Sequence, residues 1–415
     1  MLSVTIGRGV IPQADLLSST SKKDSSNVDK SKYKLVEPGD IVYNKMRAWQ
    51  GAAGGSKYRG IVSPAYIVMS PRDALTEYMH HVVRTPQFAK EAERWSYGIT
   101  SDQWSLRPEH FKMIRFPVPP ADEQTAIVKY LAHANARIDK AIAAKRRLLI
   151  LIREEAQQLA TDLVTGGLGH RVVESGVDLP EGWMVLPFLR AVTERADYRG
   201  ATPEKTEFGV TLVTAKNVRP GWIDYESSKE YVSEADYPQI MRRGLPRAGD
   251  LLLTMEAPLG NVALVDREDV AFAQRVVRFR LDGKVLRPRF ASVAMNSPYF
   301  QYQLTVRGTG STATGIKASK LPQLLIALPP ADEQDRLLGI FDQKIGTSTA
   351  IVTRVRREID LLQEFRTRLV ADVVTGQVDV RAIAATLPDA PESFDNNTVS
   401  ATDDALDEAL SEGEE

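Results

Sequence analysis

The amino-acid sequence is a tandem duplication. The hexapeptide Pro-Pro-Ala-Asp-Glu-Gln at residues 119–124 returns 210 positions later, at 329–334. The same offset relates two further matches: Gly-Asp at 39–40 and 249–250, and Asp-x-Val-Thr-Gly at 162–166 and 372–376. Three matches in one register exclude coincidence. The chain must therefore fold into two similar units.

Each hexapeptide predicts the start of a long helix. Asp122 and Asp332 can cap the first turn, the prolines stand just outside it, and acidic charge suits the positive end of the helix dipole. Each helix is expected to run for about 44 residues without proline, or roughly 65 Å at ~1.5 Å per residue. Thr-Gly at 165–166 and 375–376 predicts the helix ends.

Apolar residues in both helices recur at alternating steps of three and four, the pattern of a coiled-coil seam. Asn135 and Lys145 interrupt the first seam, and Ser348 and Arg366 interrupt the second. We expect the two helices to pair along these seams. The alternative is that each helix packs only on its own globular region. The predicted pairing residues are Leu131, Ile138, Ile142, Leu149, Ile152, Leu159, Phe341, Ile345, Val352, Val355, Ile359, Leu362 and Leu369.

A globular region of mixed pattern precedes each helix. The apolar runs after Gly-Asp, at 41–43 and 251–254, predict buried strands. A helix is expected near Pro86 and near Pro298, followed in each case by a Gly/Ser/Thr-rich loop. Apart from these landmarks the two regions share little sequence. A common scaffold that presents two different recognition surfaces would produce this pattern.

Charge is distributed unevenly along the chain. Residues 382–415 hold ten acidic residues and no Lys or Arg, so residues 1–381 carry 53 basic and 44 acidic residues, a net charge of +9. A basic body suits a nucleic-acid binder, although an ordinary charged surface is the alternative. The acidic tail is predicted to be disordered. The absence of cysteine fits a reducing cytoplasm and excludes thiolate metal sites.

The motifs of common catalytic and cofactor sites are absent. The stretch from Gly310 to Lys317 resembles a phosphate-binding loop, but Ile316 stands where that loop needs lysine. The histidines have no metal-ligand spacing, and His80 and His81 are expected on a helix face near the surface. No Asn-Pro-Pro-aromatic element of an adenine methyltransferase occurs. We therefore predict no catalytic residue, no metal site and no cofactor bound by this chain.

Binding is the remaining kind of function. Polar, basic and aromatic residues cluster in both globular regions, where Arg and Lys suit phosphates and guanine edges, and Gln and Asn suit adenine. Trp49, Trp95 and Trp104 lie in these clusters, although they could equally be core residues. The candidate DNA-binding residues are Lys45, Arg47, Gln50, Lys57, Tyr58, Arg59, Tyr97, Thr100, Ser101, Gln103, Lys216, Asn217, Arg219, Arg275, Thr309, Ser311, Thr312, Lys317 and Lys320.

The duplication, the Pro-Pro-x-x-Glu-Gln helix starts and the two divergent regions resemble the specificity subunits of type I restriction-modification systems, over residues 1 to about 381. The resemblance implies an α+β fold with two mixed α/β target-recognition domains, separated by two long antiparallel coiled-coil helices in a pseudo-twofold repeat. The implied segments are 1–118 (first recognition domain), 119–166 (first helix), 167–179 (linker), 180–328 (second recognition domain), 329–381 (second helix) and 382–415 (acidic tail).

The resemblance also implies a non-catalytic subunit that reads a bipartite double-stranded DNA target. Such a subunit docks two modification subunits, which methylate adenine with S-adenosylmethionine, and recruits restriction subunits that use ATP and Mg. The implied location is the cytoplasm of a bacterium or archaeon, without membrane contact. The alternative function is a coiled-coil adaptor or structural protein without sequence-specific DNA binding.

One departure from the family pattern concerns the first domain. The second domain opens Leu-Pro-Glu-Gly-Trp at 179–183, about 65 residues before Gly249. Only 38 residues precede Gly39, and no such opening is present there. We therefore expect the first recognition domain to be shortened at its N-terminus.

Overall fold

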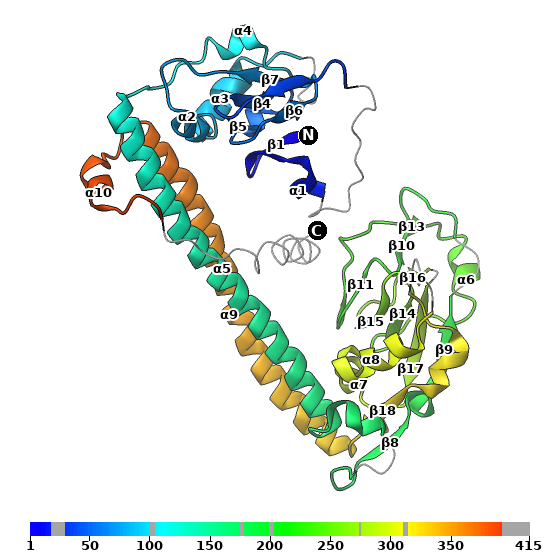
Figure 1. The fold of residues 1–415 in the computed structure, drawn as a ribbon. Helices are drawn as coiled ribbons and strands as arrows, with labels where there is room; N and C mark the ends of the chain where they lie inside the picture. The colour runs from blue at the N-terminus through cyan, green and yellow to red at the C-terminus, as the bar shows by residue number, and fades with distance from the viewer. Residues whose placement is uncertain are drawn as a thin grey trace. The chain divides into compact units, whose positions relative to one another are not determined.

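The structure is a computed structural model that describes residues 1–17, 30–98, 104–174, 178–198, 203–273, 275–309 and 314–391. Contacts divide the chain into two compact units, one of Met1–Arg147 with Val355–Glu414 and the other of Leu148–Arg354. The two longest helices, α5 (Ala121–Thr165) and α9 (Ala331–Val374), each contribute residues to both units (Figure 1).

The globular part of the first unit is built around β4 (Ile41–Asn44), which pairs antiparallel with β5 (Ala53–Gly55) and β7 (Tyr66–Met69). Ile41, Val42 and Tyr43 are buried, as the apolar run predicted. The remaining elements are β1 (Leu2–Thr5), β2 (Gly9–Pro12), α1 (Gln13–Leu17), β3 (Lys34–Val36), η1 (Ala48–Gln50), β6 (Gly60–Val62), α2 (Thr76–Val82), α3 (Pro86–Arg94) and α4 (Pro108–Phe111).

The core of the first unit joins this globular part to the long helices. Tyr43 stacks on Phe111 with ring centroids 4.8 Å apart, and Leu131 of α5 and Val373 of α9 belong to the same buried cluster. The hydroxyl of Tyr78 donates to the carbonyl of Val374 at 3.0 Å. The helix ends are therefore part of the domain core in this unit.

The second unit is built around β14 (Leu251–Met255), all five residues of which are buried. β14 lies in an antiparallel sheet with the order β15-β14-β17-β9, and a second sheet has the order β13-β10-β16. The strands are β8 (Met184–Pro187), β9 (Val192–Asp197), β10 (Val210–Val213), β11 (Val218–Arg219), β12 (Trp222–Ile223), β13 (Tyr231–Val232), β15 (Leu259–Leu264), β16 (Val270–Phe272), β17 (Val276–Leu281) and β18 (Leu325–Leu328).

Helices cover the first of these sheets and connect it to the coiled coil. Phe188 packs edge-to-face on Phe279 and Phe300, and this core includes Val164 of α5 and Leu337 of α9. The helical elements are η3 (Gly169–Val173), η4 (Phe188–Ala191), α6 (Tyr237–Ile240), α7 (Pro288–Asn296), α8 (Pro298–Arg307) and η5 (Ala318–Gln323). The helices expected near Pro86 and Pro298 are α3 and α8.

The Gly-Asp turn is repeated in atomic detail. Gly39 and Gly249 have φ of +102° and +88°, where a side chain would be strained. Asp40 then accepts a hydrogen bond from the backbone of Glu37 at 2.9 Å, and Asp250 accepts one from Arg247 at 3.0 Å. The shared dipeptide thus marks the same turn into the same central strand.

The long helices are antiparallel. In the first unit Asp139 pairs with Arg366 and Lys145 pairs with Glu358, so residue numbers rise along α5 as they fall along α9. All thirteen predicted pairing residues are buried or half-buried, while Leu151, Leu361 and Phe365, which lie off the seam, are exposed. The structure confirms the expected fold class of two mixed domains and two long antiparallel helices.

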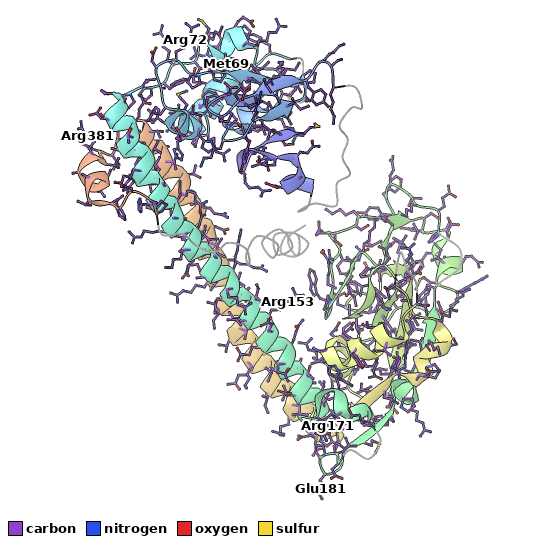
Figure 2. All side chains as sticks on the ribbon, viewed as in Figure 1. Met69, Arg72, Arg153, Arg171, Glu181 and Arg381 are labelled. Carbon is purple, nitrogen blue, oxygen red and sulfur yellow. The ribbon has the colours of Figure 1, made fainter. Side chains whose placement is uncertain are left out.

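The segment after α9 corrects the predicted tail. Disorder was expected from residue 382, but α10 (Arg381–Thr386) is helical and the chain is described to residue 391. Val380 and Ala384 are buried, which holds α10 against the first unit (Figure 1). Arg381 pairs with Asp379 at 2.7 Å and lies beside α5 (Figure 2). Burial of these two apolar side chains outweighs the acidic composition here. Residues 392–415 lie outside the described ranges.

Candidate nucleic-acid interface

In the first unit, two predicted clusters meet at one aromatic contact. Trp49, in η1 after β4, packs edge-to-face on Trp104 with ring centroids 5.5 Å apart. The Trp49 indole N–H donates to the carbonyl of Met46 at 3.1 Å, and both tryptophans are half-buried. This contact brings the residues near 45–50 to those near 97–104. Thr100, Ser101 and Gln103 themselves lie outside the described ranges.

The basic side chains around this contact face solvent. Arg47, Gln50, Lys57, Tyr58 and Arg59 are exposed, and Lys45 is half-buried. Arg59 pairs with Glu37 at 3.1 Å. Tyr97 is 57% exposed and lies 4.9 Å from the ring of His110.

Positive charge accumulates here. Burial, and then the charge of Lys45, lower the pKa of Lys34. Across the part of the chain that the structure describes, no acidic side chain forms an ion pair with Lys45, Arg47 or Lys57. Uncompensated cations on one surface suit phosphate oxygens.

In the second unit, residues far apart in sequence line one pocket of about 190 Å³. Lys216 follows β10, and Arg275 precedes β17; both line this pocket, together with Lys205 and Thr214. Lys216 and Arg275 are exposed. The Arg275 guanidinium pairs with Glu256 at 3.1 Å.

Two residues of this pocket have strained backbones. Arg275 has a φ of +73° and Ala257 has a φ of +43°, although neither is glycine. Such conformations cost about 1–3 kcal/mol each and cluster at ligand-binding sites. The strain therefore favours this pocket as part of the recognition surface of the second domain.

The residues that flank the Gly/Ser/Thr-rich loop of the second domain lie beside Glu256, at the end of β14. Thr309 bridges to Gly315, and Gly315 also bridges to Glu256 at the end of β14. Thr309, Lys317 and Lys320 are exposed, whereas Ser311 and Thr312 lie outside the described ranges.

Asn217 was predicted to contact DNA, and the structure contradicts this. Its side chain is fully buried. The amide donates to the carbonyls of Asp224 and Ser228 at 2.9 and 3.0 Å, and its oxygen accepts from the backbone of Thr214 at 2.9 Å. A side chain whose hydrogen bonds close a turn is unavailable to a base. The neighbouring Arg219 is half-buried and 3.6 Å from the carboxylate of Asp224.

His80 and His81 also differ from expectation, since both are half-buried rather than on the surface. The Nδ1 atom of His80 accepts from the backbone of Gly55 at 3.2 Å. Burial, and then the charge of Arg84, lower the pKa of His80 to about 4. These histidines pack the first domain.

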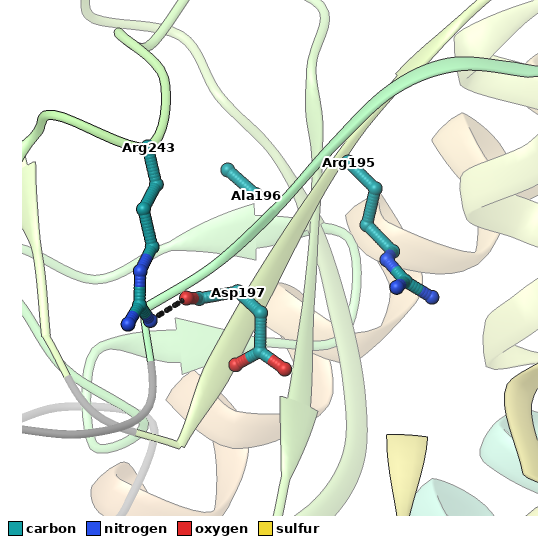
Figure 3. A pocket seen from close by; sticks show the side chains of 4 residues that line it. All are labelled: Arg195, Ala196, Asp197 and Arg243. Atoms are coloured by element: carbon teal, nitrogen blue, oxygen red, sulfur yellow. Dashed lines mark hydrogen bonds between the residues drawn. The ribbon is translucent and has the colours of Figure 1, made fainter. Parts of the chain in front are cut away.

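Sequence reasoning missed Arg195 and Arg243. They line an open depression at β9, the edge strand of the main sheet of the second unit (Figure 3). Arg243 donates to the backbone carbonyl of Asp197, and Arg195 is exposed. Arg195 stands between Glu194 and Asp197 in the sequence, and Arg243 lies 48 residues further on, so only the fold brings the two cations to one depression.

The buried glutamine of the repeated hexapeptide was also missed. In the first unit the Gln124 Oε1 atom accepts from the backbone N–H of Leu75 at 2.7 Å, and Nε2 donates to the carbonyl of Pro119 at 2.8 Å. Leu75 is the N-cap residue of α2. One side chain therefore ties the start of the long helix to a helix of the domain.

Gln334 does the same in the second unit. Its Oε1 accepts from the backbone N–H of Arg287, the N-cap residue of α7, at 2.9 Å. Its Nε2 donates to the carbonyls of Pro329 and Val285, each at 2.9 Å. Both copies of the hexapeptide are thus the same joint between domain and helix.

Comparison with known proteins finds the same architecture elsewhere. The chain is 21% identical over 373 residues to the type I restriction enzyme MjaVIII specificity subunit of Methanocaldococcus jannaschii, covering 85% of this chain and 83% of that protein. It is 19% identical to the type I restriction enzyme EcoKI specificity subunit of Escherichia coli K12, covering 83% and 75%. No family model matches the sequence.

A solved chain from a study of complex assembly and conformational transition in the type I R-M system superposes with a TM-score of 0.66. It is 16% identical and covers 87% of this chain and 89% of its own length. These matches along most of the chain and the shared fold agree with the duplicated link between domain and helix described above. The chain is therefore similar to type I restriction enzyme specificity subunits along most of its length.

Gln334→Leu is expected to lower the free energy of unfolding by about 1–3 kcal/mol, because the partly buried backbone N–H of Arg287 loses its acceptor. Gln124→Leu should do the same at Leu75. Urea denaturation measures both. Gln343→Leu, at an exposed position of α9, is the matched control and should stay within ~0.5 kcal/mol. If Gln343→Leu lowered the free energy of unfolding equally, the repeated glutamines would have no special role in linking domain to helix.

Within its described ranges, the chain has no group of His, Cys, Asp or Glu side chains arranged to hold a metal ion. None of the helices in those ranges combines the length and apolar character needed to cross a membrane.

Proposed function

We propose that this chain is the non-catalytic DNA-specificity subunit of a type I restriction-modification enzyme, reading one half of a bipartite target with each globular domain. The observation that carries the proposal is the repeated joint. The same hexapeptide, turn and central strand build two domains whose exposed surfaces differ. One scaffold that holds two unlike cationic surfaces suits a target with two unlike halves.

The interface in the first domain consists of the exposed residues around Trp49, and that in the second of the pocket of Lys216 and Arg275. Lys45, Arg47 and Lys57 suit phosphates, whereas a guanidinium on a strained backbone, as at Arg275, suits a base edge. The coiled-coil adaptor alternative predicts no sequence preference, and the match to curated specificity subunits along most of the chain favours the DNA-reading function.

The partners of this subunit are two modification subunits, docked on the long helices, and restriction subunits. S-adenosylmethionine, ATP and Mg belong to those partners, with adenine as the methylated base. The exposed apolar side chains of the long helices, among them Leu151, Leu361 and Phe365, support docking of a protein.

Methylation reconstituted from purified subunits tests the function. The chain alone should transfer no methyl group, and the chain with its modification subunit should methylate a single bipartite motif in random DNA. Robust methylation by the chain alone, or methylation without a motif when both are present, would contradict the proposal.

Arg275→Ala is expected to lower DNA affinity by about 10-fold or more and to relax preference at one base pair, since a bidentate base contact is worth about 1–3 kcal/mol. Lys216→Ala should weaken all sequences alike and reduce the salt slope by about 1. Fluorescence anisotropy over a series of half-site variants and salt concentrations measures both effects. Arg289→Ala, which removes an exposed arginine paired with Asp342, is the control. An unchanged profile for Arg275→Ala would exclude it from the interface.

A further inference from the structure

A groove of about 490 Å³ runs along α5 in the first unit, and the proposed function does not use it. Its floor contains Ala136, Ala141 and Ala144, and its rim contains His133, Arg137 and Lys140. Pro388 and Pro391 line the same groove. The groove therefore combines small apolar side chains with positive charge.

The groove lies on the face of α5 that α9 leaves uncovered. The positions 133, 137, 140 and 144 step by four, three and four, which places them in one stripe. The seam positions 131, 138 and 142 lie on the opposite side of the helix at ~100° per residue. Alanines on a solvent-facing stripe leave room for another segment to pack closely.

The chain that follows α9 already approaches this face. Arg381 lies 3.7 Å from Glu123, Asp389 pairs with Lys129 at 3.1 Å, and the carbonyl of Pro388 is 2.9 Å from Nε2 of His133. From Arg381 beside Glu123 to Pro388 beside His133, the segment follows the direction of α5. The described chain thus ends at Pro391 in the groove, heading along α5.

The next 24 residues, 392–415, have the complementary chemistry. They contain nine acidic residues and no basic residue. Leu406 and Leu410 stand four residues apart among these acids. Ten extended residues reach about 33 Å and the groove spans roughly 17 Å of helix, so the segment is long enough to fill it.

We propose that the acidic segment 392–415 binds in the groove of α5 lined by residues 133–144, as an intramolecular ligand. Its carboxylates pair with Arg137 and Lys140, and its leucines contact the alanine floor. This inference does not depend on DNA recognition, because binding of the segment can be measured without DNA.

The test uses a fluorescent peptide of residues 392–415 and the chain ending at residue 391. Fluorescence anisotropy should show that the peptide binds the shortened chain, and that affinity falls about 10-fold or more when NaCl rises from about 50 to about 300 mM. The full chain should bind the peptide at least 10-fold more weakly, since its own segment occupies the groove.

Two charge-matched variants of the shortened chain locate the contact. R137E/K140E should weaken peptide binding at least 10-fold, whereas K112E/R115E, which reverses two exposed charges outside the groove, should leave it unchanged. A peptide with Leu406 and Leu410 changed to Ser should also bind more weakly. Circular dichroism checks that each variant is folded.

Three outcomes would overturn the proposal. The first is failure of the shortened chain to bind the peptide, and the second is equal binding by R137E/K140E. The third is equal peptide binding by the full and shortened chains. Sedimentation tests one further case. If the full chain is a dimer and the shortened chain is a monomer, the segment binds the groove of a second copy. That result would reject the intramolecular assignment.

Discussion

Exchanging residues 180–328 for the equivalent domain of a type I specificity subunit is expected to replace one half of the DNA target and leave the other half unchanged. The structure supplies the reason, because the first and last strands of this segment pair with each other. β8 and β18 are antiparallel, with Met184 opposite Leu328. The segment therefore begins and ends at one place and can be replaced without altering the helices.

The expected change is complete, since a different recognition surface supplies every base contact of that half-site. Sequencing of methylated DNA from cells that express the chimera with the modification subunit measures both halves. The reciprocal exchange of residues 1–118 is the matched control and should alter only the other half. A chimera in which both half-sites changed would mean that the two domains do not read DNA independently.

Asp250→Ala is expected to destabilise the second unit by about 3–5 kcal/mol, the usual cost of removing one partner from a buried ion pair. Asp250 is 2% exposed and accepts hydrogen bonds from Arg278 and Arg280, each at 2.9 Å. Arg278 is itself 1% exposed. Without Asp250, the acidic partner left to this buried charge among the described residues is Glu194, at 3.4 Å.

The duplication provides the control for this prediction. Asp40 occupies the same turn in the first unit, but its second oxygen accepts from the hydroxyl of Ser70 at 2.6 Å instead of from arginines. Asp40→Ala should therefore cost only about 1 kcal/mol. Hydrogen exchange of β14 and β17, with β4 and β7 as the internal reference, reports each unit separately. Equal losses of stability in the two variants would show that the turn hydrogen bond, and not the buried ion pair, accounts for the cost of removing the aspartate.

The repeated sequence predicted the parts of the fold that depend on local pattern. Pro-Pro-Ala-Asp-Glu-Gln predicted helix starts, and α5 and α9 begin at Ala121 and Ala331. The runs after Gly-Asp predicted β4 and β14, because consecutive apolar residues after a turn suit a strand covered on both faces. The seam period likewise predicted which side chains of the long helices would be buried.

The candidate interface could be predicted less well. Lys216 and Asn217 are adjacent and equally polar in sequence, yet the first faces a pocket and the second closes a turn from inside. Arg195 and Arg243 gave no sequence signal, because an edge strand and a loop bring them together. Residues 382–391 were assigned by composition to a disordered tail, but two buried apolar side chains order α10.

The duplication, the two long helices with their seams, and the two central strands could be predicted from the sequence, because periodicity and turn chemistry are local properties. Tertiary structure alone decided the role of the repeated glutamine, the choice between buried and exposed polar residues, and the assembly of Lys216 with Arg275. These depend on which distant segments meet. A side chain's partners, and not its neighbours in sequence, decide whether its hydrogen bonds are used inside the protein or remain available to DNA.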